Sequence, residues 1–349
     1  MRDEKLSAML ITNFVDVSYA TGFEGDDSWA LILSDRIYLI SDFRYVEQIE
    51  VECPWVTLVV RKNSLADEVG RLALKHRLDR IGIQGEAVTL RQKQAIDAAL
   101  KPAKTRLKPT LDLMSKLRNI KDSHELGITE AAIRIAQEGF LALHPQLRVG
   151  MTENEIAGLL VYEMRRRGAS NSAFDSIICA GANGSLPHYR PADVQITGDM
   201  ALLCDWGALY RGYRSDLTRM IFLGKVPTKI REIYKIVLEA QQAAIEAIEP
   251  GARAALVDKK ARDIIARAGY KKNFGHGLGH GVGRDIHEAL SLSAKSTAVL
   301  APGMVVTVEP GIYLPGTGGV RIEDDVLVTH DGCRVLSSLP RDMESSQWM

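Results

Sequence analysis

Cysteine is scarce in this sequence of 349 residues, and the few cysteines lie far apart. No two of them have the Cys-x-x-Cys spacing of a structural zinc site, and their scatter argues against a disulfide framework. We therefore expect neither feature. Buried free thiols are expected at Cys53, Cys179, Cys204 and Cys333.

Long apolar runs and an excess of charge of one sign are also lacking. No run reaches the ~18 apolar residues needed to cross a membrane, and the charged first residues, 1–5, do not begin a signal peptide. Lys and Arg together number 44, as do Asp and Glu, so no net positive charge favours binding to phosphate backbones. These absences predict a soluble, cytoplasmic protein that binds neither membranes nor nucleic acid.

Common catalytic motifs are missing as well. No G-x-G-x-x-G follows a strand-like run, and neither G-x-S-x-G nor a phosphate-binding loop is present. His287-Glu288 lacks the second histidine of the H-E-x-x-H zinc motif. The dinucleotide-binding, serine-hydrolase, ATPase and zincin classes therefore lose their main support.

The residues that are present predict an α/β protein of two domains. The length exceeds one typical domain, and an apolar fraction of 46% is ample for sizeable cores. Before a boundary near residue 118, strand-like runs alternate with amphipathic stretches at 65–76 and 91–100, which predicts a small α/β domain. The strand-like runs are 9–11, 29–33, 37–40, 56–60 and 81–83. The predicted domains are therefore 1–118 and 119–349.

The second domain is predicted to contain an internal duplication. Capping patterns at Asp122 and Thr152 begin two helices, an apolar hairpin follows, and the same order recurs after Thr228. The second helix of each half lies between glycines 18 residues apart, and M-x4-D-x-G in the first hairpin matches M-x4-E-x-G in the second. Two such halves would face each other across a pseudo-two-fold axis.

The first hairpin carries one aspartate on each strand. If Asp205 and Asp216 are cross-strand partners, the turn is centred between Tyr210 and Arg211, and both carboxylates point to one face. Two acids in a hairpin are usually solvated surface groups, whereas a buried pair needs a cation or a shared proton. A divalent metal ion is the simplest partner for a buried pair.

The second hairpin repeats the pattern with Glu309 and Glu323, whose pairing would centre the turn on Gly316. Between the hairpins, residues 275–288 contain three histidines among alternating glycines, which let the backbone approach a crowded site. Nitrogen ligands and proton carriers could come from these histidines, which are His276, His280 and His287.

Four carboxylates and one imidazole suit two divalent cations, because the charges of the acids balance those of the ions. Carboxylate-rich sites favour Mn²⁺, with Co²⁺ or Zn²⁺ as alternatives. Such a pair polarises a bound carbonyl and lowers the pKa of a shared water, as metal-assisted hydrolysis requires. The candidates for protonating the leaving nitrogen and stabilising the oxyanion are His188, His276 and His287.

The order Asp, Asp, His, Glu, Glu resembles the pita-bread metallopeptidases, a superfamily that includes aminopeptidase P, prolidase, creatinase and methionine aminopeptidase. The resemblance extends over nearly the whole chain and depends mainly on residues 205–219, 276–288, 308–313 and 321–324. In the first domain, Thr21-Gly-Phe and Ser41-Asp-Phe-Arg-Tyr resemble the compact bacterial Xaa-Pro aminopeptidases. The implied fold is a small creatinase-like α/β domain followed by a duplicated pita-bread catalytic domain with pseudo-two-fold symmetry.

The resemblance implies a role for each candidate residue. The implied metal ligands are Asp205, Asp216, His280, Glu309 and Glu323. The two ions would be bridged by Asp216 and Glu323. The substrate site would be lined by His188, His276 and His287, while Glu309 would carry a proton and Arg321 would support the ligands. The implied activity is hydrolysis of an N-terminal Xaa-Pro bond by a metal-bridged hydroxide, on peptides with proline in second position, by a homodimer.

Several alternatives stay open at this point. The first is a prolidase, which cleaves free Xaa-Pro dipeptides. A non-catalytic protein of the same fold would have degenerate ligands, whereas this chain keeps all five. A hydrolase or lyase of a small non-peptide amide or thioether would also be compatible with the site. Two departures from the common pattern, Leu278 for threonine and Leu290 for proline, bear on subsite shape rather than on metal binding.

Overall fold

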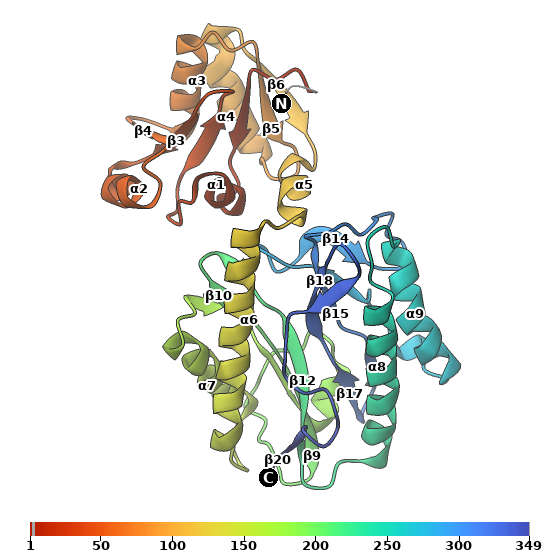
Figure 1. Cartoon of the computed structure of the whole chain (residues 1–349). Helices are drawn as coiled ribbons and strands as arrows, with labels where there is room; N and C mark the ends of the chain where they lie inside the picture. The colour runs from red at the N-terminus through yellow and green to blue at the C-terminus, as the bar shows by residue number, and fades with distance from the viewer. Residues whose placement is uncertain (2–3, 349) are drawn as a thin grey trace. The chain divides into compact units, whose positions relative to one another are not determined.

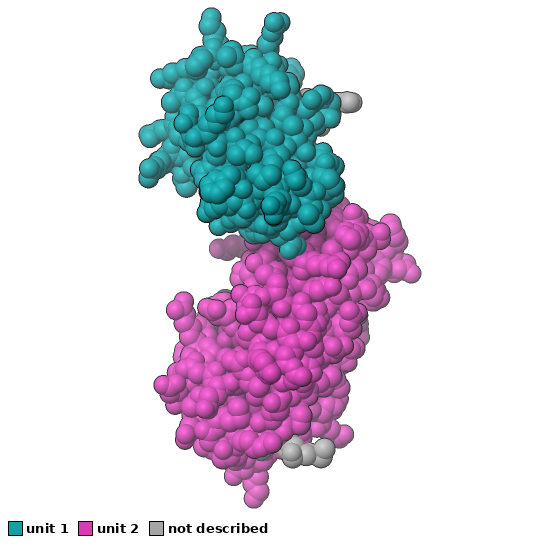
Figure 2. All heavy atoms as spheres, turned by 90° about the vertical axis from the view of Figure 1, so that its left-hand side faces the viewer, with its two compact units in different colours: residues 1–117 teal, residues 118–349 magenta. Residues whose placement is uncertain are grey.

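The chain forms two compact units, Met1–Leu117 and Arg118–Met349 (Figure 2). The computed structural model describes residue 1 and residues 4–348 (Figure 1). Each unit has hydrophobic core clusters of its own.

Unit 1 is a six-stranded sheet with helices on both faces. Its strands, in the sheet order β4-β3-β2-β1-β5-β6, are β1 (Ala8–Ile11), β2 (Trp29–Ile32), β3 (Ile37–Ser41), β4 (Thr57–Val60), β5 (Arg80–Gln84) and β6 (Arg106–Thr110). Its helices are α1 (Phe14–Thr21), α2 (Val46–Glu52), α3 (Leu65–Lys75) and α4 (Leu90–Leu100). Because side chains alternate along a strand, Leu10 of β1 packs with α3 and α4, whereas Met9 and Ile11 pack with α1 and α2.

The strand-like runs and amphipathic stretches predicted for unit 1 are confirmed as β1 to β5, α3 and α4. The sequence did not indicate β6, because residues 101–110 are mostly polar and include two prolines. β6 is an edge strand that pairs with β5 alone, with Pro109 opposite Ile83. An edge position tolerates a residue without a backbone N–H, so Pro109 does not prevent pairing.

The cysteines are free thiols, and Cys53, Cys179 and Cys204 are buried. Cys333 differs from the prediction because it is only partly buried, and its thiol donates to the carbonyl oxygen of Ile245 at 3.3 Å. Among the helices that the structure describes, none is long and apolar enough to cross a membrane.

Unit 2 contains the predicted recurrence of two helices followed by strands. After α5 (Leu113–Asn119), which crosses the division between the units, the first half comprises α6 (Ser123–Leu143), α7 (Glu153–Arg166), β7 (Asn171–Ser172), β8 (Ile177–Ala180), β9 (Met200–Trp206), β10 (Ala208–Tyr210), β11 (Tyr213–Arg214) and β12 (Leu217–Leu223). The predicted N-cap at Asp122 and the predicted capping box at Thr152 are confirmed, and Asp122 also forms a capping box at the start of α6.

The second half of unit 2 has the same order. It comprises α8 (Thr228–Glu246), α9 (Ala254–Arg267), β13 (Gly279–Gly281), β14 (Glu288–Leu292), β15 (Val305–Val308), β16 (Gly311–Leu314), β17 (Gly318–Arg321), β18 (Asp324–Val328) and β19 (Cys333–Val335), followed by β20 (Gln347–Trp348). The larger sheets have the strand orders β20-β12-β9-β8 and β14-β13-β15-β18-β19. Two smaller sheets, β11-β10-β7 and β16-β17, continue the hairpins.

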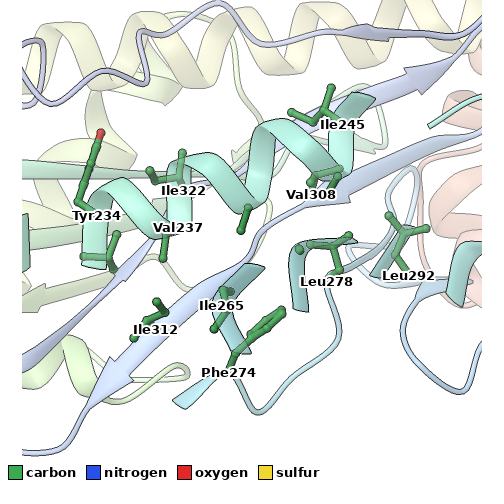
Figure 3. Close-up of a cluster of buried hydrophobic side chains, with 14 of the residues drawn as sticks. Tyr234, Val237, Ile245, Ile265, Phe274, Leu278, Leu292, Val308, Ile312 and Ile322 are labelled. Carbon is green, nitrogen blue, oxygen red and sulfur yellow. The ribbon is translucent and has the colours of Figure 1, made fainter. Parts of the chain in front are cut away.

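The helices of unit 2 cover the sheets on two sides, and Figure 1 shows α6 and α8 on opposite sides of the strands. Along β9, Leu202 and Trp206 pack with α6 and α7, whereas the alternate residue Leu203 packs with α8 and α9. Figure 3 shows this second cluster, in which Tyr234 of α8 and Val308 of β15 are among the labelled residues. Apolar burial on both sides thus fixes the strands that end at the acidic residues.

The first hairpin is shifted by two residues from the predicted register. Asp205 of β9 lies opposite Thr218 of β12 rather than opposite Asp216, so the predicted pairing is wrong. The turn is Arg211-Gly212, where both residues are left-handed, with φ of 46° and 78°. A two-residue turn of this kind matches the twist of paired strands and therefore fixes the register. As a result, Asp216 lies just before β12.

The second hairpin has the predicted register. β15 pairs with β18, and β16 with β17, in one continuous antiparallel register centred on Gly316. Val308 lies opposite Asp324. Glu309 and Glu323 therefore occupy facing positions between the two paired segments.

Gly207 marks a close approach in the first hairpin. A Cβ added there would lie 1.8 Å from the carbonyl oxygen of Ser215, so Gly207→Ala requires the backbone to move. We expect this change to lower the free energy of unfolding by about 2–3 kcal/mol, measured by urea denaturation. In the control Gly158→Ala, an added Cβ on α7 meets no described atom within 4 Å, so stability should rise by ~0.5–1 kcal/mol. Equal stability of the two variants would contradict this account.

Candidate metal centre

The nine residues predicted for the site all line one cavity of about 500 Å³ in unit 2. The ligand atoms of Asp216, His280 and Glu323 lie within 4.8 Å of one another. Glu309 Oε1 lies 3.4 Å from His280 Nε2. The volume is in the range of small-molecule sites, so residues far apart in the chain converge on a space that can hold a ligand.

Both halves of unit 2 supply acids to this cavity. The first half contributes Asp205 from β9 and Asp216 from the residue before β12. The second half contributes Glu309 from between β15 and β16, Glu323 from between β17 and β18, and His280 from β13. The cavity thus lies where the two hairpins meet, as the predicted duplication requires.

Thr218 and Arg321 join the hairpins beside the acids. The backbone N–H of Glu323 donates to the carbonyl oxygen of Thr218 at 3.2 Å, and the Thr218 hydroxyl donates to Glu323 Oε2 at 2.6 Å. Arg321 donates through Nη2 to Asp205 Oδ2 and through Nε to the Thr218 hydroxyl at 3.2 Å. These hydrogen bonds hold acids from opposite hairpins close together although their charges repel.

Burial and mutual repulsion disfavour the charged forms of these acids. Burial, followed by the neighbouring carboxylates, raises the pKa of Asp216 and of Glu323 well above the ordinary values. Burial also raises the pKa of Glu309 to about 8, although the nearby Arg321 opposes the shift. His280 is affected in the opposite direction, since burial lowers its pKa to about 4 and keeps the ring neutral near pH 7.

The donor set fits divalent cations. Asp205 Oδ1 is buried without a hydrogen-bond partner among the described residues. His280 Nδ1 lies 3.1 Å from the carbonyl oxygen of Gly281, which only accepts, so Nδ1 carries the proton and Nε2 keeps its lone pair. That Nε2 lies 3.5 Å from Asp216 Oδ2. A neutral imidazole nitrogen among close carboxylates suits Mn²⁺, Co²⁺ or Zn²⁺, whose charge would offset the repulsion.

His276 is linked to the acids by hydrogen bonds through Tyr313. Arg321 Nη1 donates to the Tyr313 hydroxyl at 2.8 Å, so this hydroxyl donates in turn to His276 Nε2 at 2.9 Å. His276 Nδ1 donates to the carbonyl oxygen of Gly277 at 2.7 Å. Burial, and then the charge of Arg321, lowers the pKa of His276 to about 4. With both ring nitrogens engaged, the neutral His276 is suited to orienting its neighbours rather than to protonating a substrate.

His287 and His188 are placed differently, because both are exposed within the cavity. The ring of His287 meets that of His280 edge to face, with 4.3 Å between the ring centres. These two histidines can therefore reach a molecule bound in the cavity.

Sequence reasoning missed three residues that support the site, namely Thr218, Tyr313 and Asp325. Asp325 Oδ2 accepts from the backbone N–H of Asp216 at 3.0 Å. Thr218 and Asp325 each follow an acidic residue of the site by two positions, and residues two apart in an extended strand point to the same face. This two-residue spacing was the signal that the sequence offered. Apolar residues of the same strands have the same spacing, so it does not distinguish Thr218 and Asp325 from them.

The raised pKa of Glu309 makes the stability of the metal-free protein depend on pH. The folded state holds a proton on Glu309 up to about pH 8, whereas the unfolded chain releases it near pH 4. The stabilising contribution of the protonated Glu309 is therefore greatest below this window and is lost as the pH rises through it. We expect its unfolding temperature to fall between about pH 5 and pH 8.5, and Glu309→Gln to reduce that slope. A metal-free protein that became more stable with rising pH would contradict the burial of these acids.

Two family models match the chain. The creatinase/prolidase N-terminal domain matches residues 1–120, and metallopeptidase family M24 matches residues 128–330. An uncharacterized peptidase of Bacillus subtilis, YqhT, is 39% identical over 339 residues, which cover 97% of this chain and 95% of that protein.

Solved structures agree with these matches. The chain is similar to an Xaa-Pro dipeptidase from Bacillus anthracis, with a TM-score of 0.93, 38% identity and coverage of 98% of this chain and 95% of that one. It is also similar to an X-Pro aminopeptidase from Thermotoga maritima, with a TM-score of 0.91, 35% identity and coverage of 98% and 99%. The predicted fold class, a creatinase-like α/β domain followed by a pita-bread domain, is confirmed. The chain therefore belongs to metallopeptidase family M24 and is a hydrolase of the pita-bread fold.

Proposed function

We propose that this protein is a dinuclear metal-dependent aminopeptidase that hydrolyses the N-terminal Xaa-Pro bond of peptides. The observation that carries the proposal is the convergence of acids from both hairpins on His280, in a cavity that also exposes His188 and His287. Membership of a metallopeptidase family and the similarity to proteins named for Xaa-Pro cleavage support it.

The proposed metal ligands are Asp205, Asp216, His280, Glu309 and Glu323. Asp216 and Glu323 would hold both ions, because they come from opposite hairpins and their ligand atoms lie within 4.8 Å of one another and of that of His280. Four carboxylates balance the charge of two divalent ions, and a carboxylate-rich set favours Mn²⁺. Arg321 neutralises part of the charge of Asp205 and holds that carboxylate in place.

Divalent ions in this position supply a Lewis acid for the scissile carbonyl and lower the pKa of the attacking water. The side chains provide the proton transfers. Glu309 accepts the proton that the water loses, His188 donates a hydrogen bond to the developing oxyanion, and His287 protonates the leaving nitrogen. We give His276 an orienting role, since its two nitrogens bond to Tyr313 and Gly277.

Proline in second position is consistent with this arrangement. The nitrogen of an Xaa-Pro bond carries no hydrogen, so a peptidase that holds the scissile amide by its N–H loses that contact. A site that holds the substrate by its free α-amine and its carbonyl oxygen does not depend on the N–H. Leu278 and Leu290, the departures from the common pattern, are buried in the hydrophobic core, so they influence the subsite only through packing.

A prolidase is the second candidate. The similar structure from Bacillus anthracis is named an Xaa-Pro dipeptidase, whereas that from Thermotoga maritima is named an X-Pro aminopeptidase. The same ligands serve either activity, and the two differ in whether the substrate ends after proline.

The metal assignment predicts a specific stoichiometry. Dialysed protein reconstituted with Mn²⁺ should hold about two ions per chain by elemental analysis, as expected for a two-metal site. Loss of a bridging ligand in Asp216→Ala or Glu323→Ala should lower this number, whereas the surface variant Glu130→Ala should not change it. Stoichiometry that is unchanged in both ligand variants would refute the assignment.

The substrate assignment is tested with a small panel of peptides. The Mn²⁺-loaded protein should cleave Ala-Pro-Ala well above Ala-Ala-Ala, and acetylation of the amino terminus should abolish cleavage because the free amine is lost. Cleavage of the dipeptide Ala-Pro above that of Ala-Pro-Ala would assign a prolidase instead. Equal rates on Ala-Pro-Ala and Ala-Ala-Ala, or cleavage of acetylated peptides, would contradict Xaa-Pro specificity.

A further inference from the structure

We infer that Arg118 is a positioning residue that fixes the location of His287 through a buried ion pair with the loop that carries it. This inference rests on the proposed role of His287 as the proton donor to the leaving nitrogen. Arg118 belongs to unit 2, is 7% exposed, and is not among the residues that line the cavity.

Arg118 contacts both flanks of His287. Its Nη2 lies 2.6 Å from Asp285 Oδ2, two residues before His287, and 2.7 Å from Glu288 Oε1, one residue after it. The Glu288 side chain is only 2% exposed, whereas that of Asp285 is 42% exposed. One guanidinium nitrogen therefore ties together the two carboxylates that bracket the histidine.

The loop needs such a contact because it lies outside the strand pairing. β13 and β14 pair with a register shift, in which His280 lies opposite Ser291 but Gly281 lies opposite Glu288. Residues 282–287 are left as a loop between the paired positions. The start of this loop is held by its backbone, where Gly283 O accepts from the N–H of Arg214 at 2.8 Å.

The end of the loop is held mainly by side chains. Glu288 Oε1 accepts from the backbone N–H of Asp285 at 3.3 Å as well as from Arg118. A Cβ on Gly283 would lie 2.7 Å from Glu288 Oε1 and 3.3 Å from Lys121 Nζ, so the loop is closely packed around this carboxylate. Removing the guanidinium would leave Glu288 buried without its nearest charged donor, and such a carboxylate moves toward water or changes its partners.

His287 itself is exposed in the cavity, and its ring contacts that of His280. Its location therefore follows the loop. A displacement of about 1 Å in a catalytic group can cost about 10²-fold in rate, so the ion pair can control turnover without touching the substrate. The metal ligands are positioned by other contacts, namely those of Thr218, Arg321 and Asp325.

A double-mutant cycle with His287→Ala separates positioning from general stabilisation. In Mn²⁺-loaded protein, Arg118→Met should lower kcat on Ala-Pro-Ala by about 10–100-fold, with KM within about threefold and the Mn²⁺ content unchanged. In the His287→Ala background the same change should lower kcat by less than about twofold, because no donor is left to misplace. Arg118→Lys should recover part of the loss, since it restores the charge.

Arg334→Met is the matched control. Arg334 pairs with Glu130 on the surface, so its loss should change kcat by less than about twofold in either background. If Arg118→Met does not fold, the cycle is repeated with Glu288→Gln, which removes the charge and keeps the shape.

The outcomes distinguish the two proposals. Equal losses from Arg118→Met with and without His287, or a loss explained by missing Mn²⁺, would overturn the positioning role and leave the proposed function intact. Normal turnover of metal-replete His287→Ala would overturn the role of His287 and the positioning role with it.

Discussion

The repulsion among four carboxylates, three of them buried and that of Glu309 partly buried, is the constraint on which the rest of unit 2 depends. Asp205, Asp216, Glu309 and Glu323 line one cavity, and burial raises the pKa of each, with neighbouring carboxylates adding to the shift for Asp216, Glu309 and Glu323. Among the described residues, Arg321 lines the same cavity and forms an ion pair with one of these carboxylates, that of Asp205. Because the fold keeps the remaining negative charges close to one another, it favours the binding of positively charged ligands such as divalent cations.

The duplicated architecture provides the rigidity for this arrangement. Each pair of acids lies on or beside a hairpin whose strands are fixed by apolar packing on the helices of unit 2. The two hairpins are joined directly by Thr218 and Glu323, through a backbone and a side-chain hydrogen bond. The acids are therefore preorganised by contacts between the halves, while the exposed histidines His188 and His287 lie on more irregular segments. This division suits a site in which the acids stay fixed while the positions of the exposed histidines depend on their loops.

Much of this organisation could be predicted from the sequence because it follows from local patterns. Capping residues located α6 and α7, spacing indicated the duplication, and a turn centred on Gly316 gave the second hairpin its correct register. The predicted register of the first hairpin was wrong because it was derived from the two aspartates alone. The observed register is set by the turn residues Arg211 and Gly212, which both adopt positive φ. Tyr313 and Arg118 could not be identified, because their roles depend on contacts with residues distant in the chain or on hydrogen-bond direction.

The most direct test of the central claim is anomalous diffraction from crystals grown with Mn²⁺, with data collected on both sides of the manganese absorption edge. The account predicts two anomalous peaks in the cavity, with oxygens of Asp216 and Glu323 contacting both and His280 Nε2 contacting one. A single peak, or peaks coordinated by residues outside this set, would contradict the proposal that the two hairpins together hold a pair of ions.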